Sequence, residues 1–256
     1  MIAALPMYDM PGLRDATDAL WTAIAARLRA TGVDAPEMLT RSDELYEIWL
    51  RPDLLLSQTC GLPYRTKLHR HVTLVATPDY GLPGCPPGMY CSVIVARDGT
   101  PGDPARLDGA RLAYNDALSQ SGWAAPLHWA GQRGIRFGEL VHSGSHRASA
   151  QAIAEGQADL AAIDAVTWRL LRRFEPWTSD FREIARTPPS PGLPLITAPR
   201  QDAETLATAV DAAITDLGHD TRTRLGLTGL ARIDKTAYLS QPTPPSPEDY
   251  LKSLGI

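Results

Sequence analysis

The tetrapeptide Ser119-Gln120-Ser121-Gly122 has the clearest chemical potential in this sequence. It follows an expected strand and begins an expected helix, so the two hydroxyls and the amides of Ser121, Gly122 and Trp123 would face one point. Gly122 has no side chain to block close approach. Such a turn can bind a small oxyanion through dipoles, with the helix dipole adding roughly 0.3–1 kcal/mol. A serine that only caps the helix is the alternative interpretation.

A second helix start, Gly144-Ser145-His146, comes one strand later. We interpret His146 as a hydrogen-bond donor to the same anion, while a capping or surface role stays open. His142 precedes His146 by four residues, which would suit a metal pair on one helix. Because His142 ends an expected strand, the two histidines do not share a helix, and we predict no metal and no cofactor.

Asp164 ends another expected strand. A carboxylate beside an oxyanion repels it unless a proton lies between them or the ligand carries a cation. Asp164 therefore indicates a protonated oxyanion or an amine-bearing ligand, although it could equally cap the next helix, and both roles can coexist. Since ligands gather at the carboxyl ends of parallel strands, we add Tyr8, Gln58 and Thr59 to the candidate binding residues.

Motifs for catalysis are missing from the sequence. It contains no G-x-S-x-G elbow, no phosphate-binding P-loop and no G-x-G-x-x-G after the first strand. The three cysteines are odd in number and lack C-x-x-C spacing, which argues against a disulfide framework and a zinc ribbon. We therefore predict a binding protein rather than an enzyme.

The composition is that of a globular chain of one large or two small domains. Of 256 residues, 44% are hydrophobic and 21% are charged. The net charge of −4 argues against nucleic acid or an anionic membrane as the main partner. No apolar run reaches about 18 residues, so we predict no membrane span.

Apolar periodicity predicts alternating strands and helices, and hence an α/β fold with largely parallel sheets. We expect strands at residues 2–8, 53–59, 72–77, 91–96, 110–115, 137–142, 159–163 and 181–187. We expect helices at residues 13–28, 42–49, 119–130, 145–156, 165–173, 202–217 and 248–254.

The elements fall into two series, which predicts two lobes. We assign residues 1–97 and 188–256 to the first lobe and residues 98–187 to the second. The two crossing segments, near residues 96–99 and 185–189, would act as hinges, with stiff proline-rich stretches beside them. The alternative is that these proline-rich stretches, which hold many of the 22 prolines, are ordinary surface loops.

Five segments occur in an order that resembles the phosphate, phosphite and phosphonate substrate-binding proteins of ABC transporters. The resemblance covers roughly residues 2–200. The segments are Tyr90-Cys-Ser-Val-Ile-Val-Ala-Arg97, Leu107-Asp-Gly-Ala-Arg111, Ser119-Gln-Ser-Gly122, Gly144-Ser-His146 and Gly156-Gln-Ala-Asp-Leu-Ala-Ala-Ile-Asp164.

The resemblance implies a type II periplasmic-binding-protein fold, with two α/β lobes that close on a small oxyanion in the cleft between them. It implies delivery of this ligand to an ABC permease. The family's Ser-x-Ser-Gly turn and histidine, which contact the oxyanion, correspond here to Ser119, Gln120, Ser121 and His146. Its aromatic residue before the crossing strand corresponds to Tyr90.

The sequence departs from the family pattern in three respects. The chain is shorter than typical members, with a reduced helical tail after residue 200. The N-terminus shows no secretion signal or lipoprotein anchor, so a periplasmic location is implied by the resemblance while a cytoplasmic one stays open. The acidic residues that recognise a ligand amine are not clearly matched. The second hypothesis is therefore a cytoplasmic enzyme or sensor on the same scaffold that acts on a small anionic metabolite.

Overall fold

The computed structural model describes residues 1–42, 44–100 and 102–255. The chain forms two compact units. The first comprises Met1–Met89 with Pro191–Ser240, and the second comprises Tyr90–Ser190 with Gln241–Ile256. The first boundary therefore comes before the strand Ser92–Arg97 instead of after residue 97, because this strand pairs on both sides with strands of the second unit. The C-terminal segment also belongs to the second unit, not to the lobe expected at residues 188–256.

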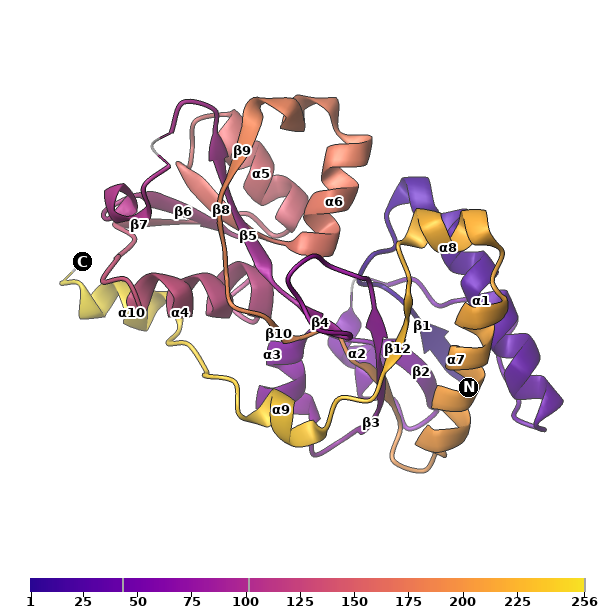
Figure 1. Ribbon diagram of the computed structural model, residues 1–256. Coiled ribbons are helices and arrows are strands. Elements are labelled where there is room, and N and C mark those ends of the chain that lie inside the picture. Colours follow the sequence, from indigo (N-terminus) through magenta and orange to yellow (C-terminus); the bar gives the residue numbers. More distant parts are fainter. Residues whose placement is uncertain (43, 101, 256) are drawn as a thin grey trace. The chain divides into compact units, whose positions relative to one another are not determined.

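The sheet of the first unit has the strand order β1-β2-β11-β3-β12 (Figure 1). Its strands are β1 (Ile2–Ala4), β2 (Leu54–Gln58), β3 (Thr73–Asp79), β11 (Leu195–Thr197) and β12 (Gly229–Ala231). β1 is parallel to β2, and β11 is inserted antiparallel between β2 and β3. β1, β2 and β3 therefore run in one direction, so their carboxyl ends meet at one edge.

Helices cover both faces of this sheet. They are α1 (Arg14–Ala30), α2 (Leu45–Trp49), α3 (Gly61–Pro63), α7 (Ala203–Asp216), α8 (His219–Leu225) and α9 (Lys235–Leu239). α1 packs against α7 and α8. Ala3 and Leu55 are buried in the cluster that contains α1 and α7, whereas Ala4 and Leu54 are buried among residues of α2 and α9. Successive residues thus face opposite sides, as the period of two in a strand requires.

The sheet of the second unit has the order β7-β6-β8-β5-β9. Its strands are β5 (Ser92–Arg97), β6 (Arg111–Tyr114), β7 (Glu139–His142), β8 (Leu160–Asp164) and β9 (Phe181–Arg186). β6 is parallel to both β7 and β8, whereas β5 is antiparallel to β8 and β9. The start of β5 therefore lies at the same edge as the carboxyl ends of β6, β7 and β8. A separate two-stranded sheet pairs β4 (Met89–Tyr90) with β10 (Ser190–Pro191).

The helices of the second unit are α4 (Ala125–Gly131), α5 (His146–Ala154), α6 (Ala165–Phe174) and α10 (Pro247–Ser253). Short 3-10 turns occur at Pro11–Leu13, Pro104–Leu107 and Pro176–Asp180, and π-helical turns at Tyr64–Leu68 and Gln120–Ala124. Two hydrogen bonds attach the C-terminal segment to this unit. The indole of Trp123 donates to the Pro245 carbonyl at 2.9 Å, and the Phe137 amide donates to the Tyr250 hydroxyl at 2.7 Å.

The α/β fold expected from the sequence is confirmed, and most expected elements are present. The strand expected at residues 2–8 ends at Ala4, because Pro6 has no amide to donate. β11, β12, α8 and α9 were not expected, since they are short and β11 lies in a proline-rich stretch. Asp43, in the expected helix 42–49, lies outside the described residues. Within the described chain, no helix is both long and apolar enough to span a bilayer.

Candidate functional site

The carboxyl ends of β7, β6 and β8 lie next to one another in the second unit. The loop after β6 leads to Ser119, the loop after β7 leads to His146, and β8 ends in Asp164. Parallel pairing of these strands places Ser119, His146 and Asp164 at one edge of the sheet of the second unit. This is the edge at which α/β sheets commonly bind ligands.

The π-helical turn Gln120–Ala124 and its N-cap Ser119 are called the serine turn below. Ser119 Oγ accepts a hydrogen bond from the Gly122 amide at 2.9 Å. The Ser119 carbonyl accepts from the amides of Trp123 at 3.2 Å and Ala124 at 3.0 Å. The prediction that the Gly122 and Trp123 amides face a ligand is therefore wrong, because the turn closes on Ser119.

The hydroxyls of the serine turn form a small polar cluster. Ser121 Oγ lies 2.8 Å from Nε2 of His146 and 3.5 Å from Ser119 Oγ. The Ser121 carbonyl accepts a hydrogen bond from Ser92 Oγ at 2.8 Å, which attaches the turn to the start of β5. Ser119, Gln120 and Ser121 are all buried. The structure thus joins His146 to the serine turn through the hydroxyl of Ser121.

His146 is the first residue of α5, whose N-cap Ser145 accepts a hydrogen bond from the Ala148 amide. Burial lowers the pKa of His146 from 6.5 to about 4, and a smaller effect of the Ala162 backbone acts in the opposite direction. The imidazole is therefore neutral at pH 7. Its Nδ1 atom is buried. His146 therefore contributes a neutral, dipolar group and not a cation to this edge of the sheet.

Gly122 is required by the close approach of a neighbouring side chain. A Cβ atom at position 122 would lie 1.8 Å from Oδ1 of Asn115 and 3.3 Å from Cε1 of His146. Oδ1 of Asn115 is itself buried, with no hydrogen-bond partner in the described segments. The absence of a side chain at Gly122 therefore admits the amide of Asn115 to the serine turn.

Asp164 caps α6. Its Oδ1 atom accepts a hydrogen bond from the Thr167 amide at 2.8 Å, and the residue is buried. Asp164 is also the β8 partner of Ser92 in β5. The capping interpretation from the sequence is thus confirmed, while contact with a ligand stays a prediction.

The other predicted residues lie elsewhere in the chain. Tyr90, which is buried, belongs to the second unit, whereas Tyr8, Gln58 and Thr59 belong to the first. The side chain of Gln58 donates to the Leu193 carbonyl at 3.3 Å. The hydroxyl of Thr59 is buried and finds no hydrogen-bond partner within the described ranges.

The candidate list from the sequence omitted Asn115, Ser92 and Thr187. Thr187 Oγ1 accepts a hydrogen bond from the Ser92 amide at 2.9 Å, next to the serine turn. Asn115 directly follows β6, so strand-end geometry places it at this edge of the sheet. Ser92 could not be found in this way, because it starts a strand and reaches the edge only through the antiparallel direction of β5.

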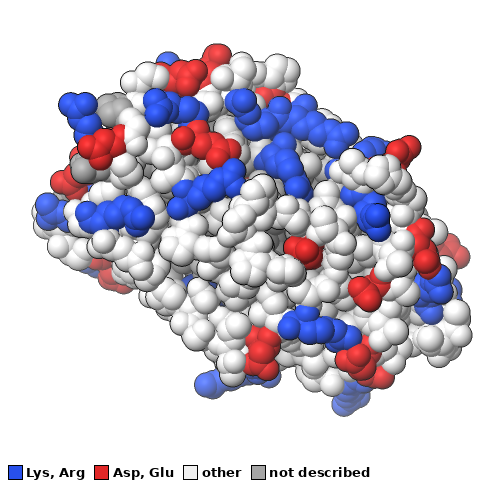
Figure 2. Space-filling view, viewed as in Figure 1, with Lys and Arg blue, Asp and Glu red and all other residues white. Residues whose placement is uncertain are grey.

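Several basic side chains of the second unit form ion pairs with acidic side chains at its surface. Figure 2 shows Lys and Arg side chains along the upper part of this face, with acidic side chains beside several of them. Arg147 pairs with Glu175, Arg186 with Glu183 and Arg111 with Asp159. Over the described ranges, no cluster of three or more His, Cys, Asp or Glu side chains could hold a metal ion.

Comparison with known proteins gives one family and several similar structures. Residues 4–250 match the family model described as the phosphonate periplasmic substrate-binding protein of ABC transporters. None of the curated proteins compared with the chain matches it.

Three solved structures illustrate the similarity in fold. XAC2383 from Xanthomonas citri, bound to chloride, is 19% identical with a TM-score of 0.70, over 99% of this chain and 95% of that chain. PhnD1 from Prochlorococcus marinus, in complex with methylphosphonate, is 16% identical with a TM-score of 0.68, over 99% of this chain and 98% of its own. PA3383 from Pseudomonas aeruginosa, a binding protein of an ABC phosphonate transporter, is 15% identical with a TM-score of 0.67, over 99% and 94% of the two chains.

The family match covers nearly the whole chain, and the fold is that of the similar binding proteins. The chain therefore belongs to the periplasmic substrate-binding proteins of phosphonate ABC transporters, and it captures a small solute for a permease instead of catalysing a reaction.

Proposed function

We propose that the captured solute is a phosphorus oxyanion, of the phosphonate, phosphite or phosphate type, and that the serine turn is its main binding element. The observation that carries this proposal is the cluster of Ser119, Ser121 and the neutral His146, with 2.8 Å between Ser121 Oγ and His146 Nε2. Hydroxyl groups and backbone amides hydrogen-bond strongly to an anion, because charge-assisted hydrogen bonds are roughly twice as strong as neutral ones.

The neutral histidine acts through Ser121. A neutral imidazole carries one N–H, which can lie on either ring nitrogen. A bound anion favours the proton on Nε2, because His146 then donates to Ser121 Oγ and the hydroxyl proton of Ser121 turns toward the anion. His146 is in this proposal a positioning residue for Ser121.

The remaining candidate residues complete the proposed set. Gln120 and Tyr90 contribute further polar contacts from the second unit, and Gly122 admits the amide of Asn115 beside the turn. Asp164 accepts a hydrogen bond from the hydroxyl of a singly protonated oxyanion while it continues to cap α6. Tyr8, Gln58 and Thr59, from the first unit, are proposed as additional ligand contacts, in support of which Thr59 has a buried hydroxyl without a partner among the described residues. We also propose that the protein works in the periplasm, as the family description states.

Calorimetric titration of the purified protein with phosphate, phosphite and methylphosphonate tests the proposal, with sulfate and malate as controls. At least one phosphorus oxyanion should bind and raise the melting temperature. A ligand at 100 times its Kd adds about 2.7 kcal/mol to the free energy of unfolding. Stabilisation by malate alone, with no response to any phosphorus oxyanion, would overturn the proposal.

A further inference from the structure

The C-terminal segment, residues 241–255, packs on the serine turn. Trp123 belongs to this turn, and its indole N–H donates to the Pro245 carbonyl at 2.9 Å. The ring of Tyr250 in α10 packs edge to face on the indole, with ring centroids 5.8 Å apart. The residues on both sides of this contact belong to the second unit. The C-terminal segment is therefore a direct neighbour of the element that we propose binds the anion.

The side chain of Trp123 is held firmly within this unit. It is fully buried, and the ring of Tyr114, at the end of β6, also packs against the indole, with centroids 5.0 Å apart. The only polar atom of an indole is its N–H, and a buried N–H that loses its acceptor is costly. The Pro245 carbonyl therefore fixes the position of Trp123 in the turn.

The C-terminal segment has attachments of its own besides the indole. The hydroxyl of Tyr250 accepts a hydrogen bond from the Phe137 amide at 2.7 Å. Ser246 caps α10, because its Oγ atom accepts from the Asp249 amide at 3.1 Å. Tyr250 also packs against the apolar cluster that contains Trp123 and Phe137. The segment can thus act as a fixed support for Trp123.

The backbone of the serine turn benefits from such a support. The Ala124 amide donates to the Ser119 carbonyl, five residues earlier, at 3.0 Å. This π-helical register is rare and occurs mostly as single turns, frequently at functional sites. A change to the α-helical register would rotate Ser121 by about 100° relative to α4, because each residue of an α-helix turns by that angle. The register therefore decides whether Ser121 Oγ reaches Nε2 of His146.

We propose that the C-terminal segment holds the serine turn in its π-helical register through Trp123, and thereby sets the affinity of the protein for its anion. Trp123 and Tyr250 are positioning residues in this inference, since they act through Ser121 and do not touch the anion. The inference rests on the proposed function, because that function assigns anion binding to the serine turn.

Calorimetric titration of Tyr250→Ala with phosphate, phosphite and methylphosphonate tests the inference. The substitution removes the ring from the indole and the acceptor from the Phe137 amide. The Kd of the best wild-type ligand should rise by about tenfold, equivalent to ~1.4 kcal/mol. In a Ser121→Ala background the same substitution should change the Kd by less than about twofold, because the hydroxyl through which it acts is gone.

A second variant keeps the inference testable if Tyr250→Ala does not fold. Trp123→Phe retains an aromatic ring but cannot donate to the Pro245 carbonyl. It should also raise the Kd in the wild-type background and leave it nearly unchanged in the Ser121→Ala background.

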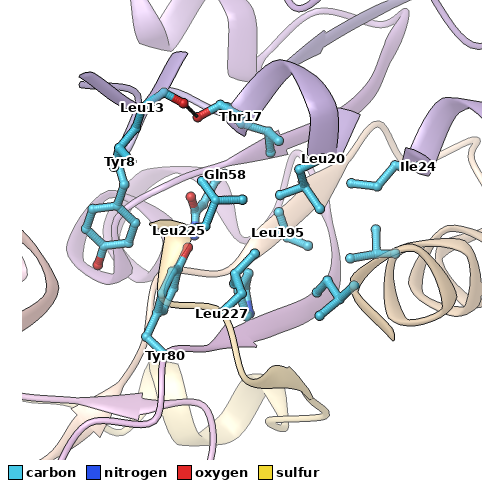
Figure 3. Close-up of a pocket in the computed structure, with 14 residues that line it drawn as sticks. Tyr8, Leu13, Thr17, Leu20, Ile24, Gln58, Tyr80, Leu195, Leu225 and Leu227 are labelled. Carbon is cyan, nitrogen blue, oxygen red and sulfur yellow. Dashed lines mark hydrogen bonds between the residues drawn. The ribbon is translucent and has the colours of Figure 1, made fainter. Parts of the chain in front are cut away.

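Two control variants separate this effect from a general loss of stability. Lys252→Ala changes an exposed residue of α10 and should keep the wild-type Kd. Ile24→Val shortens a buried side chain of the first unit, where Ile24 lines an apolar cavity of about 40 Å³ (Figure 3). It should lower the melting temperature and leave the Kd unchanged.

Nitrogen-15 spectra of histidine-labelled protein without ligand provide a second readout. The Nε2 signal of His146, assigned with His146→Gln, reports its hydrogen bond to Ser121. This signal should shift in Tyr250→Ala and stay in place in Lys252→Ala and Ile24→Val.

The outcomes separate the two proposals. An unchanged Kd in Tyr250→Ala, or in Trp123→Phe if only that variant folds, would overturn the inference and leave the proposed function intact. Equal losses of affinity in the wild-type and Ser121→Ala backgrounds would do the same. Failure of all three anions to bind the wild type would overturn the proposed function itself, and the Nε2 signal would then decide whether the segment holds the turn.

Discussion

His146 meets Ser121 through its Nε2 atom, 2.8 Å from the serine hydroxyl, at the junction of two loops that follow neighbouring parallel strands. The contact joins α5 to the serine turn across 25 residues of sequence. Because burial lowers the pKa of His146 to about 4, the pair is neutral at pH 7. The polarity of the site thus comes from hydroxyl and amide dipoles.

Replacement of Ser121 by alanine should weaken phosphorus oxyanion binding by roughly 1–3 kcal/mol, the usual cost of a lost hydrogen bond to a charged group. Isothermal titration of Ser121→Ala with the best wild-type ligand measures this loss. Ser179→Ala is the matched control, because Ser179 is exposed in the same unit. Equal affinities of Ser121→Ala and the wild type would restrict the serine turn to a structural role.

The free energy of unfolding should rise with pH because His146 has a lower pKa in the folded chain than in the unfolded chain. The pKa of this residue is 6.5 in its ordinary state and about 4 in the folded chain. Between these values the unfolded chain binds a proton that the folded chain does not, so the free energy of unfolding increases from pH 4 to pH 6.5. The contribution reaches at most about 3 kcal/mol and is constant above pH 7.

Urea denaturation of the wild type and His146→Gln at pH 4.5, 5.5, 6.5 and 7.5 isolates this contribution. Other acidic groups affect both proteins alike, so the difference between the two should shrink as the pH falls. Parallel stability curves for the two proteins would show that His146 is not buried in its neutral form.

Gly122→Ala should destabilise the protein by about 1–3 kcal/mol, because its Cβ would lie 1.8 Å from Oδ1 of Asn115. In an Asn115→Ala background the same substitution should cost clearly less, since the nearest remaining contact is Cε1 of His146 at 3.3 Å. A double-mutant cycle of unfolding free energies measures the coupling. Additive effects of the two substitutions would mean that Asn115 does not impose glycine at position 122.

Tyr250→Phe should destabilise the second unit by roughly 1–3 kcal/mol, because it removes the acceptor of the Phe137 amide. Thermal or urea unfolding measures the effect. Lys252→Ala, an exposed residue of the same helix, should change the free energy of unfolding by less than about 0.5 kcal/mol. Similar losses for both variants would indicate that the tyrosine hydroxyl contributes nothing specific.

The sequence by itself determined the features that depend on neighbouring residues. Ser119, Ser145 and Asp164 cap the helices expected to start after them, since capping needs only a side chain two or three residues from the amide it accepts. Strand and helix alternation gave the α/β class, because a period of 2 or 3.6 residues is a local property. The order of the motifs gave the family.

Tertiary structure decided what depends on pairing between distant segments. Antiparallel β5 placed Ser92 at the serine turn, and the same pairing put the first boundary between the units before Tyr90. In the π-helical turn, the amides of Gly122 and Trp123 donate hydrogen bonds to Ser119. The sequence had assigned these two amides to the ligand. No local sequence pattern predicts these arrangements, because strand direction and packing depend on the free energy of the whole unit.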